Sequence, residues 1–155
     1  MDKVNWKFDN TYSKLSKSFR EFIKPTPVHN PEIIIFNHQL AKDLNLDLSK
    51  LNNVELSNIF SGNDLPKESK TLAQAYAGHQ FGHFTMLGDG RAVLLGEHLD
   101  NKKNRYDIQF KGSGRTSFSR GGDGRAALGP MLREYLISEA CLLYTSPSPR
   151  DSGKS

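Results

Sequence analysis

The 155-residue sequence contains a single cysteine, Cys141, which excludes a disulfide within the chain. No set of cysteines and histidines has the spacing of a zinc site, so we assign no metal ligands in this sequence. No stretch approaches the about 18 apolar residues of a membrane span, and the N-terminus lacks the apolar run of a signal peptide. These absences predict a cytoplasmic protein with no membrane partner and no structural metal.

Charge and apolar content are both modest. Lysine and arginine outnumber aspartate and glutamate by 21 to 17, and the isoelectric point is about 9.2. Because the basic residues are not gathered into one run, this excess does not by itself indicate a nucleic-acid partner. The sequence has 36% hydrophobic residues and a mean hydropathy of −0.58, which indicates a globular domain somewhat short of apolar material and is compatible with a fragment.

Apolar periodicity predicts the elements of the first half of the chain. The first thirty residues mix aromatic with polar side chains and close on a Pro-Thr-Pro sequence, which favours an extended arm that packs on another part of the protein. The elements expected after the arm are a buried strand at 33–36, a short helix at 37–48, an apolar patch at 54–62 and a helix at 69–77.

In the second half, glycine-rich turns separate strands. Residues 92–97 and 105–111 are predicted strands, and residues 128–140 a predicted helix. Polar and apolar side chains alternate along 105–111, so Lys111 is expected to point away from the apolar layer. From residue 141 the chain becomes rich in serine and proline, which predicts a disordered or foreign tail over 141–155.

The pentapeptide Gly-Asp-Gly-Arg-Ala occurs twice, at 88–92 and at 122–126. One Asp-Gly pair is typical of a tight turn and indicates nothing more. Two copies that each contain arginine favour phosphate binding, because glycine lets backbone N–H groups approach an anion and arginine can hold phosphate with two parallel hydrogen bonds. A small phosphate ligand is therefore the preferred interpretation.

Lys111 ends a predicted strand, a glycine-rich loop follows it, and Glu134 lies on the next predicted helix. Protein kinases have the same order of a strand lysine and a helix glutamate that orients the lysine on nucleotide phosphates. Surface lysines are far commoner than catalytic ones, so this interpretation depends on the glycine motifs. His79 and His83 are interpreted as packing or turn residues, because the glycines beside them disfavour the helix that a paired metal site would need.

Four stretches of the sequence closely resemble the selenoprotein O family, and the likeness extends more loosely over about residues 5 to 140. The four stretches are Tyr76-Ala77-Gly78-His79-Gln80-Phe81-Gly82-His83, Leu87-Gly88-Asp89-Gly90-Arg91-Ala92, Gln109-Phe110-Lys111-Gly112-Ser113-Gly114-Arg115-Thr116 and Ser119-Arg120-Gly121-Gly122-Asp123-Gly124-Arg125-Ala126, the last running on through Leu132-Arg133-Glu134-Tyr135.

The resemblance implies an α+β fold like the N-lobe of a protein kinase, with a mainly antiparallel sheet, a helix that carries Glu134, and an N-terminal arm. It also implies transfer of AMP from ATP to Ser, Thr or Tyr hydroxyls of protein substrates. The residues that would bind the nucleotide are Gly88, Gly90, Arg91, Lys111, Asp123 and Gly124. Lys111 and Glu134 would form the catalytic pair.

In that family the ligands of the divalent ion, Mg²⁺ or Mn²⁺, lie in a C-terminal part that has no counterpart here. We therefore expect residues 1–140 to be a truncated nucleotide-binding part that is inactive by itself. The residues alone leave two alternatives open, which are a kinase-like protein that transfers phosphate and a non-catalytic module that binds a nucleotide or a nucleic acid.

Overall fold

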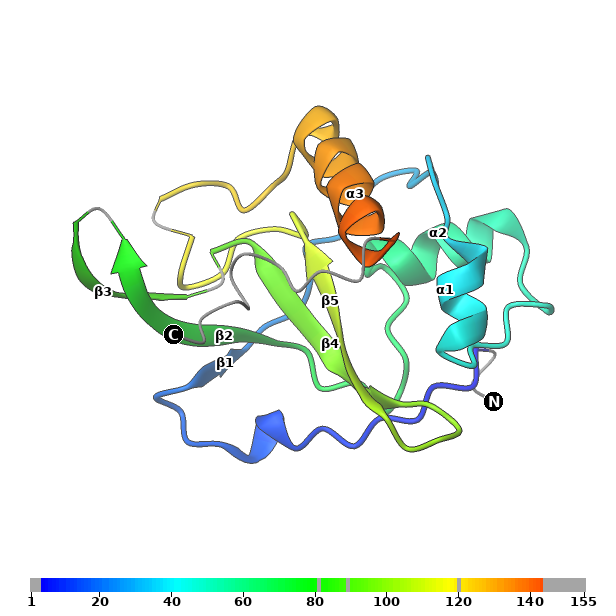
Figure 1. The fold of residues 1–155 in the computed structure, drawn as a ribbon, viewed down its shortest axis with the longest axis horizontal. Helices are drawn as coiled ribbons and strands as arrows, with labels where there is room; N and C mark the ends of the chain where they lie inside the picture. The colour runs from blue at the N-terminus through cyan, green and yellow to red at the C-terminus, as the bar shows by residue number, and fades with distance from the viewer. Residues whose placement is uncertain (1–3, 81, 89, 120, 144–155) are drawn as a thin grey trace. The chain divides into compact units, whose positions relative to one another are not determined.

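The computed structural model describes residues 4–80, 82–88, 90–119 and 121–143. The chain divides into two compact units, Met1–Arg125 and Ala126–Ser155, and each is described by itself. The elements in chain order are the 3-10 turn η1 (Tyr12–Lys14), β1 (Arg20–Phe22), α1 (His38–Asp43), α2 (Asn53–Ser61), β2 (Leu72–Gln80), β3 (His83–Gly88), β4 (Ala92–Leu99), β5 (Arg105–Lys111) and α3 (Leu128–Leu143) (Figure 1).

The first unit is built on a five-stranded sheet in which every strand pair is antiparallel. Its strand order is β1-β2-β4-β5, and β3 pairs with β2 in a long hairpin (Figure 1). The strands predicted at 92–97 and 105–111 are confirmed as β4 and β5. An antiparallel sheet with few helices is the expected α+β architecture and is compatible with a kinase-like N-lobe.

The N-terminal arm packs on the chain's own sheet. Val4 and Trp6 belong to the same buried cluster as Leu95 of β4 and Phe110 of β5. The Trp6 ring stacks on Phe8 with 5.3 Å between ring centroids. Backbone hydrogen bonds then join the arm to the end of β4, as the isolated bridge between Phe8 and residue 98 illustrates. The predicted arm is therefore an integral part of this core.

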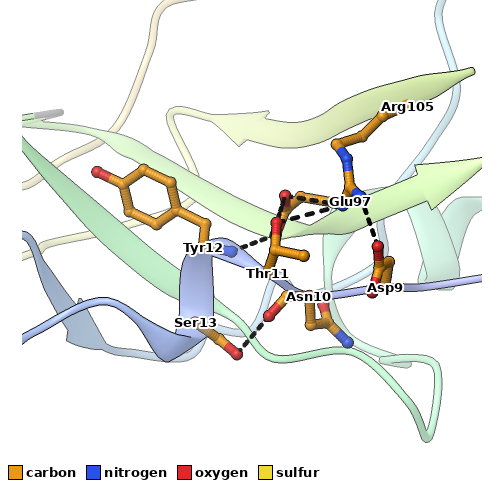
Figure 2. Close-up of polar contacts among 7 residues, drawn as sticks. All are labelled: Asp9, Asn10, Thr11, Tyr12, Ser13, Glu97 and Arg105. Carbon is orange, nitrogen blue, oxygen red and sulfur yellow. Dashed lines mark hydrogen bonds and ion pairs between the residues drawn. The ribbon is translucent and has the colours of Figure 1, made fainter.

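A polar cluster fixes the arm beside β4 and β5 (Figure 2). Glu97 is only 5% exposed and accepts hydrogen bonds from the Thr11 hydroxyl at 2.5 Å and the Tyr12 N–H at 2.6 Å. Arg105 contacts Glu97 at 3.1 Å and forms an ion pair with Asp9 at 2.5 Å. The hydrogen bond to Asp9 is the main reason that the pKa of Arg105 is raised. The buried carboxylate is thus held by several donors, as its burial requires.

The helix predicted over residues 69–77 is wrong, because this segment enters the central strand β2. Leu72 and Ala73 are 0% exposed, and Leu72 pairs with both Phe22 of β1 and Leu94 of β4. A strand covered on both faces loses the alternation of polar and apolar residues. Its apolar positions therefore matched a helical period by coincidence.

The strand predicted at 33–36 is also wrong, since these residues form neither a strand nor a helix. Ile34 and Ile35 are 61% and 51% exposed, so the apolar run is not buried within this chain. The helix predicted at 37–48 is real but shorter. It forms α1, which follows an Asn37 cap and gives way to a positive φ of 59° at Asn45.

The apolar patch at 54–62 is part of helix α2. Asn52 and Glu55 form a capping box in which each side chain accepts the backbone N–H of the other residue. Gly62 ends the helix in a left-handed conformation with a φ of 84°. The Asn-x-x-Glu spacing is visible in the sequence and was the signal that could have predicted this helix.

The second unit contains α3, which confirms the helix predicted at 128–140 and continues to Leu143. Glu134 lies on this helix with an exposed side chain. The described helices include none with the length and apolar content to cross a membrane. Residues 144–155 lie outside the described residues, so the tail and its boundary at 140 stay predictions.

The loop between β4 and β5 offers a test of pH-dependent stability. Asp100 accepts the N–H groups of Lys102 and Asn104 and the Asn104 amide, each at 2.8 Å. Burial works to raise the pKa of Asp100, but these hydrogen bonds outweigh it and the pKa lies below the usual value. A carboxyl with a lowered folded-state pKa stabilises the fold above its unfolded pKa and loses that effect as the pH falls through its folded pKa.

Asp100→Asn should therefore lower the free energy of unfolding at about pH 7, because an amide has one acceptor oxygen and its NH₂ would face another donor. The difference from the unaltered chain should shrink below about pH 4. Urea unfolding at about pH 7 and below about pH 4 measures the difference in the free energy of unfolding between the variant and the unaltered chain. Asp64→Asn is the matched control, because Asp64 is exposed. A difference that stays constant with pH would contradict this role of the carboxylate.

Candidate phosphate-binding site

The end of strand β5 presents Lys111 on its polar face. Ile108 and Phe110 turn toward the core, whereas Gln109 and Lys111 are exposed, as the alternation predicted. Gln109 donates a hydrogen bond of 2.7 Å to Gln74 of β2, so the polar face continues across the sheet. Asp107 lies on the same face, and burial is the main cause that raises its pKa. The alternation along β5 thus points Lys111 away from the apolar layer.

The first Gly-Asp-Gly-Arg turn lies between β3 and β4, next to the end of β5. Lys111 is the register partner of Ala92, and the Gly112 N–H donates to the Arg91 carbonyl at 2.7 Å. The structure thus brings the backbone of Gly88, Gly90 and Arg91 to the end of the sheet where Lys111 lies. Within the part of the chain that the structure describes, the exposed Arg91 guanidinium forms no hydrogen bond or ion pair.

The loop after β5 packs closely on this first turn. A Cβ atom at Gly88 would come within 2.1 Å of the Phe118 ring, and one at Gly90 would lie 3.0 Å from the Phe118 carbonyl oxygen. The Ser119 hydroxyl donates a short hydrogen bond to the Gly90 carbonyl. Gly88 is therefore required by close packing as well as by any role in ligand binding.

The second Gly-Asp-Gly-Arg turn closes back on the start of the same loop. A Cβ atom at Gly124 would lie 1.9 Å from the Gly114 carbonyl oxygen, and Gly124 has a φ of 70°. The Gly114 N–H donates to the Gly124 carbonyl at 3.2 Å. Arg115 donates to the Gly122 carbonyl at 3.0 Å, so its guanidinium helps to hold the turn.

Asp123 and the proline-rich part of the arm complete the loop. The Asp123 carboxylate is exposed and accepts the Arg125 N–H at 2.9 Å, which organises the turn. Thr26 donates its N–H to the Ser113 carbonyl at 2.7 Å, and Arg125 donates to the Pro27 carbonyl at 3.4 Å. The arm therefore supports the loop from residues distant in sequence.

Hydrogen bonds connect both glycine turns and the end of β5 at Lys111 in one loop cluster. The family resemblance assigned residues of both turns and Lys111 to one nucleotide site, but the residue pattern alone did not predict these connections. The sequence analysis assigned no role to Thr116, Phe118 and Ser119, which link the cluster. No chemical motif marks these three residues in the sequence. Glu134 lies in the second unit, and its pairing with Lys111 stays a prediction.

Among the described residues, no group of three or more His, Cys, Asp or Glu side chains could hold a metal ion. His79 and His83 lie on β2 and β3 with exposed side chains, and the His79 ring packs edge-on against Phe84 at 6.3 Å between centroids. This contact joins two exposed side chains, so the interpretation of both histidines as packing or turn residues stays a prediction.

Comparison with known proteins identifies the family. Residues 2–148 match the family model described as protein adenylyltransferase SelO. The protein nucleotidyltransferase YdiU of Pelagibacter ubique is 64% identical over 147 residues, which cover 95% of this chain and 30% of that protein. YdiU of Anoxybacillus flavithermus is 58% identical over 147 residues, covering 95% of this chain and 31% of that protein. YdiU of Brevibacillus brevis is 60% identical over 135 residues, which cover 87% of this chain and 28% of that protein.

The chain spans about 30% of the length of these curated relatives. The family match covers nearly all of the chain, including both glycine turns, Lys111 and Glu134. The chain belongs to the protein adenylyltransferase SelO family.

Proposed function

We propose that a full-length protein containing this chain transfers AMP from ATP to Ser, Thr or Tyr hydroxyls of other proteins. In this proposal the first unit binds the triphosphate. The observation that carries it is the loop cluster, in which two glycine turns and the exposed end of β5 are joined by hydrogen bonds. Membership in an adenylyltransferase family supports the choice of reaction.

The proposed binding chemistry follows from the residue types. We assign Gly88, Gly90 and Gly124 to the two turns whose backbone N–H groups would donate to phosphate oxygens. The space that a Cβ atom would need at each of these glycines is filled by Phe118 or Gly114, so the missing side chains allow the close packing of the two turns. Arg91 is suited to hold two phosphate oxygens in parallel hydrogen bonds, and Lys111 to act as a point charge. We assign Asp123 to the same pocket, because its turn is tied to the loop that leaves Lys111.

The proposed reaction is a displacement at the α-phosphorus of ATP. The oxygen of the protein hydroxyl forms a bond to that phosphorus, the bond to the pyrophosphate oxygen breaks, and pyrophosphate leaves with the electron pair. The hydroxyl proton passes to a base that we expect outside the described residues. Lys111 and Arg91 stabilise the negative charge on the phosphate oxygens, and Glu134 is kept as the carboxylate that orients Lys111.

A divalent ion such as Mg²⁺ or Mn²⁺ is part of the proposal for the full-length protein. The described residues do not fit such an ion, since they include no cluster of three ligating side chains. We therefore assign its ligands to other parts of the protein and derive no step through it. For the same reason we expect the 155-residue chain alone to transfer no AMP.

The test compares ATP labelled at the α-phosphate with ATP labelled at the γ-phosphate, each incubated with full-length protein, a divalent ion and an acceptor protein. AMP transfer predicts covalent α-label and an acceptor mass increased by AMP. Label from the γ-phosphate alone would instead establish phosphate transfer. ATP binding without either label would indicate a non-catalytic module. The isolated chain, assayed in parallel, should label nothing, and labelling by it would overturn the need for further residues.

A further inference from the structure

The segment 116–119 forms a small, internally bonded turn beside the first glycine turn. The Ser119 N–H donates to the Thr116 carbonyl at 3.1 Å, and the Thr116 N–H donates to the Ser119 hydroxyl at 2.8 Å. The Phe118 N–H donates to the Thr116 hydroxyl at 3.1 Å. Thr116 is only 4% exposed. These contacts hold Phe118 and Ser119 in one arrangement relative to each other.

Two contacts then connect this segment to the glycine turn. The Ser119 hydroxyl, which already accepts the Thr116 N–H, donates its own hydrogen to the Gly90 carbonyl. The Phe118 ring lies over Gly88, where a Cβ atom would be 2.1 Å away. The hydroxyl therefore uses both its donor and an acceptor site in one continuous chain of hydrogen bonds.

The hydrogen bond from Ser119 to the Gly90 carbonyl fixes the orientation of the peptide unit between Gly90 and Arg91. A trans peptide is planar, so the Gly90 carbonyl and the Arg91 N–H point to opposite sides of one rigid unit. Holding the carbonyl toward Ser119 directs the Arg91 N–H to the other side. The next peptide is held as well, because the Arg91 carbonyl accepts the Gly112 N–H at 2.7 Å. Both peptide units that flank the Arg91 side chain are thus fixed by the loop after β5.

We propose that Ser119 and Phe118 are positioning residues that hold the first glycine turn in its phosphate-binding conformation and thereby set the affinity for ATP. This inference rests on the proposed function of the cluster. Neither residue needs to contact the nucleotide. Their effect reaches it through Gly88, Gly90 and Arg91, whose conformations they hold.

The test uses full-length protein and measures the Kd for ATP by calorimetry without an acceptor, together with kcat and KM for AMP transfer. Ser119→Ala should raise the Kd and the KM for ATP about 3- to 10-fold, the factor expected for the loss of one hydrogen bond. The KM for the acceptor protein and the thermal unfolding midpoint should hardly change. Ser119→Thr keeps the hydroxyl, so this variant should retain the ATP affinity of the unaltered protein. The matched control is Ser117→Ala, because Ser117 is exposed in the same segment.

Three further variants test Phe118 independently. Phe118→Ala and Gly88→Ala should each raise the Kd for ATP, and the double variant should lose less affinity than the sum of the two single losses, because both changes act on the same contact. Equal ATP affinities for Ser119→Ala and Ser117→Ala, or an unchanged Kd for Phe118→Ala, would overturn the proposal. Because Kd is measured without transfer, a protein that binds ATP but transfers no AMP would refute the proposed function and still test the positioning role.

Discussion

Lys111→Met in the full-length protein should reduce AMP transfer by about a hundredfold or more while leaving the fold intact. Lys111 is exposed on the polar face of β5, where an ion pair contributes only about 0–1 kcal/mol to stability. In the proposed transition state the same ammonium group meets charge on phosphate oxygens. Loss of one such positioned group typically costs about 3–4 kcal/mol of activation free energy, which corresponds to that change in rate.

The measurement is kcat/KM for AMP transfer together with thermal unfolding. Lys67→Met is the matched control. Lys67 is exposed in the connection between α2 and β2, and its replacement by methionine changes the charge and the side-chain length in the same way. We expect the control to retain its activity. A folded Lys111→Met protein with most of its activity would refute the assignment of Lys111 to the site.

Gly124→Ala should disrupt the loop cluster far more than Gly121→Ala in the same loop. Both glycines have a positive φ, 70° at Gly124 and 81° at Gly121, so alanine meets a similar backbone strain of about 1–2 kcal/mol at either position. Only Gly124 lacks space, since its Cβ atom would lie 1.9 Å from the Gly114 carbonyl oxygen, whereas nothing lies within 4 Å at Gly121. Overpacking of this kind adds about 1–3 kcal/mol.

Urea unfolding and ATP binding by the two full-length variants measure this difference. Because backbone atoms of residues 114 and 115 must move to admit the extra carbon, Gly124→Ala should lose ATP affinity as well as stability. Gly121→Ala should show the backbone strain alone and retain most of its affinity. Equal losses in the two variants would mean that the close contact between the two parts of the loop has no role in the site.

Local pattern was sufficient for several features of this protein. The alternation of residues 105–111 predicted strand β5 and the exposed position of Lys111, because a strand places successive side chains on opposite faces whatever its neighbours are. The helical period of residues 128–140 predicted α3. The two Gly-Asp-Gly-Arg sequences marked turns, because Asp-Gly pairs favour tight turns wherever they occur.

Tertiary contacts decided the features that involve distant residues. Leu72 and Ala73 belong to a strand because β1 and β4 lie on both sides of them, and that pairing outweighs their helical spacing. The two glycine turns form one cluster only because the loop after β5 returns to both of them, through Ser119 to Gly90 and through Gly114 to Gly124. The sequence by itself therefore determined the residue types and the local backbone freedom of the proposed phosphate site. Folding decided that the two turns and the end of β5 meet, since contacts between residues far apart in the chain have no periodic signal in the sequence.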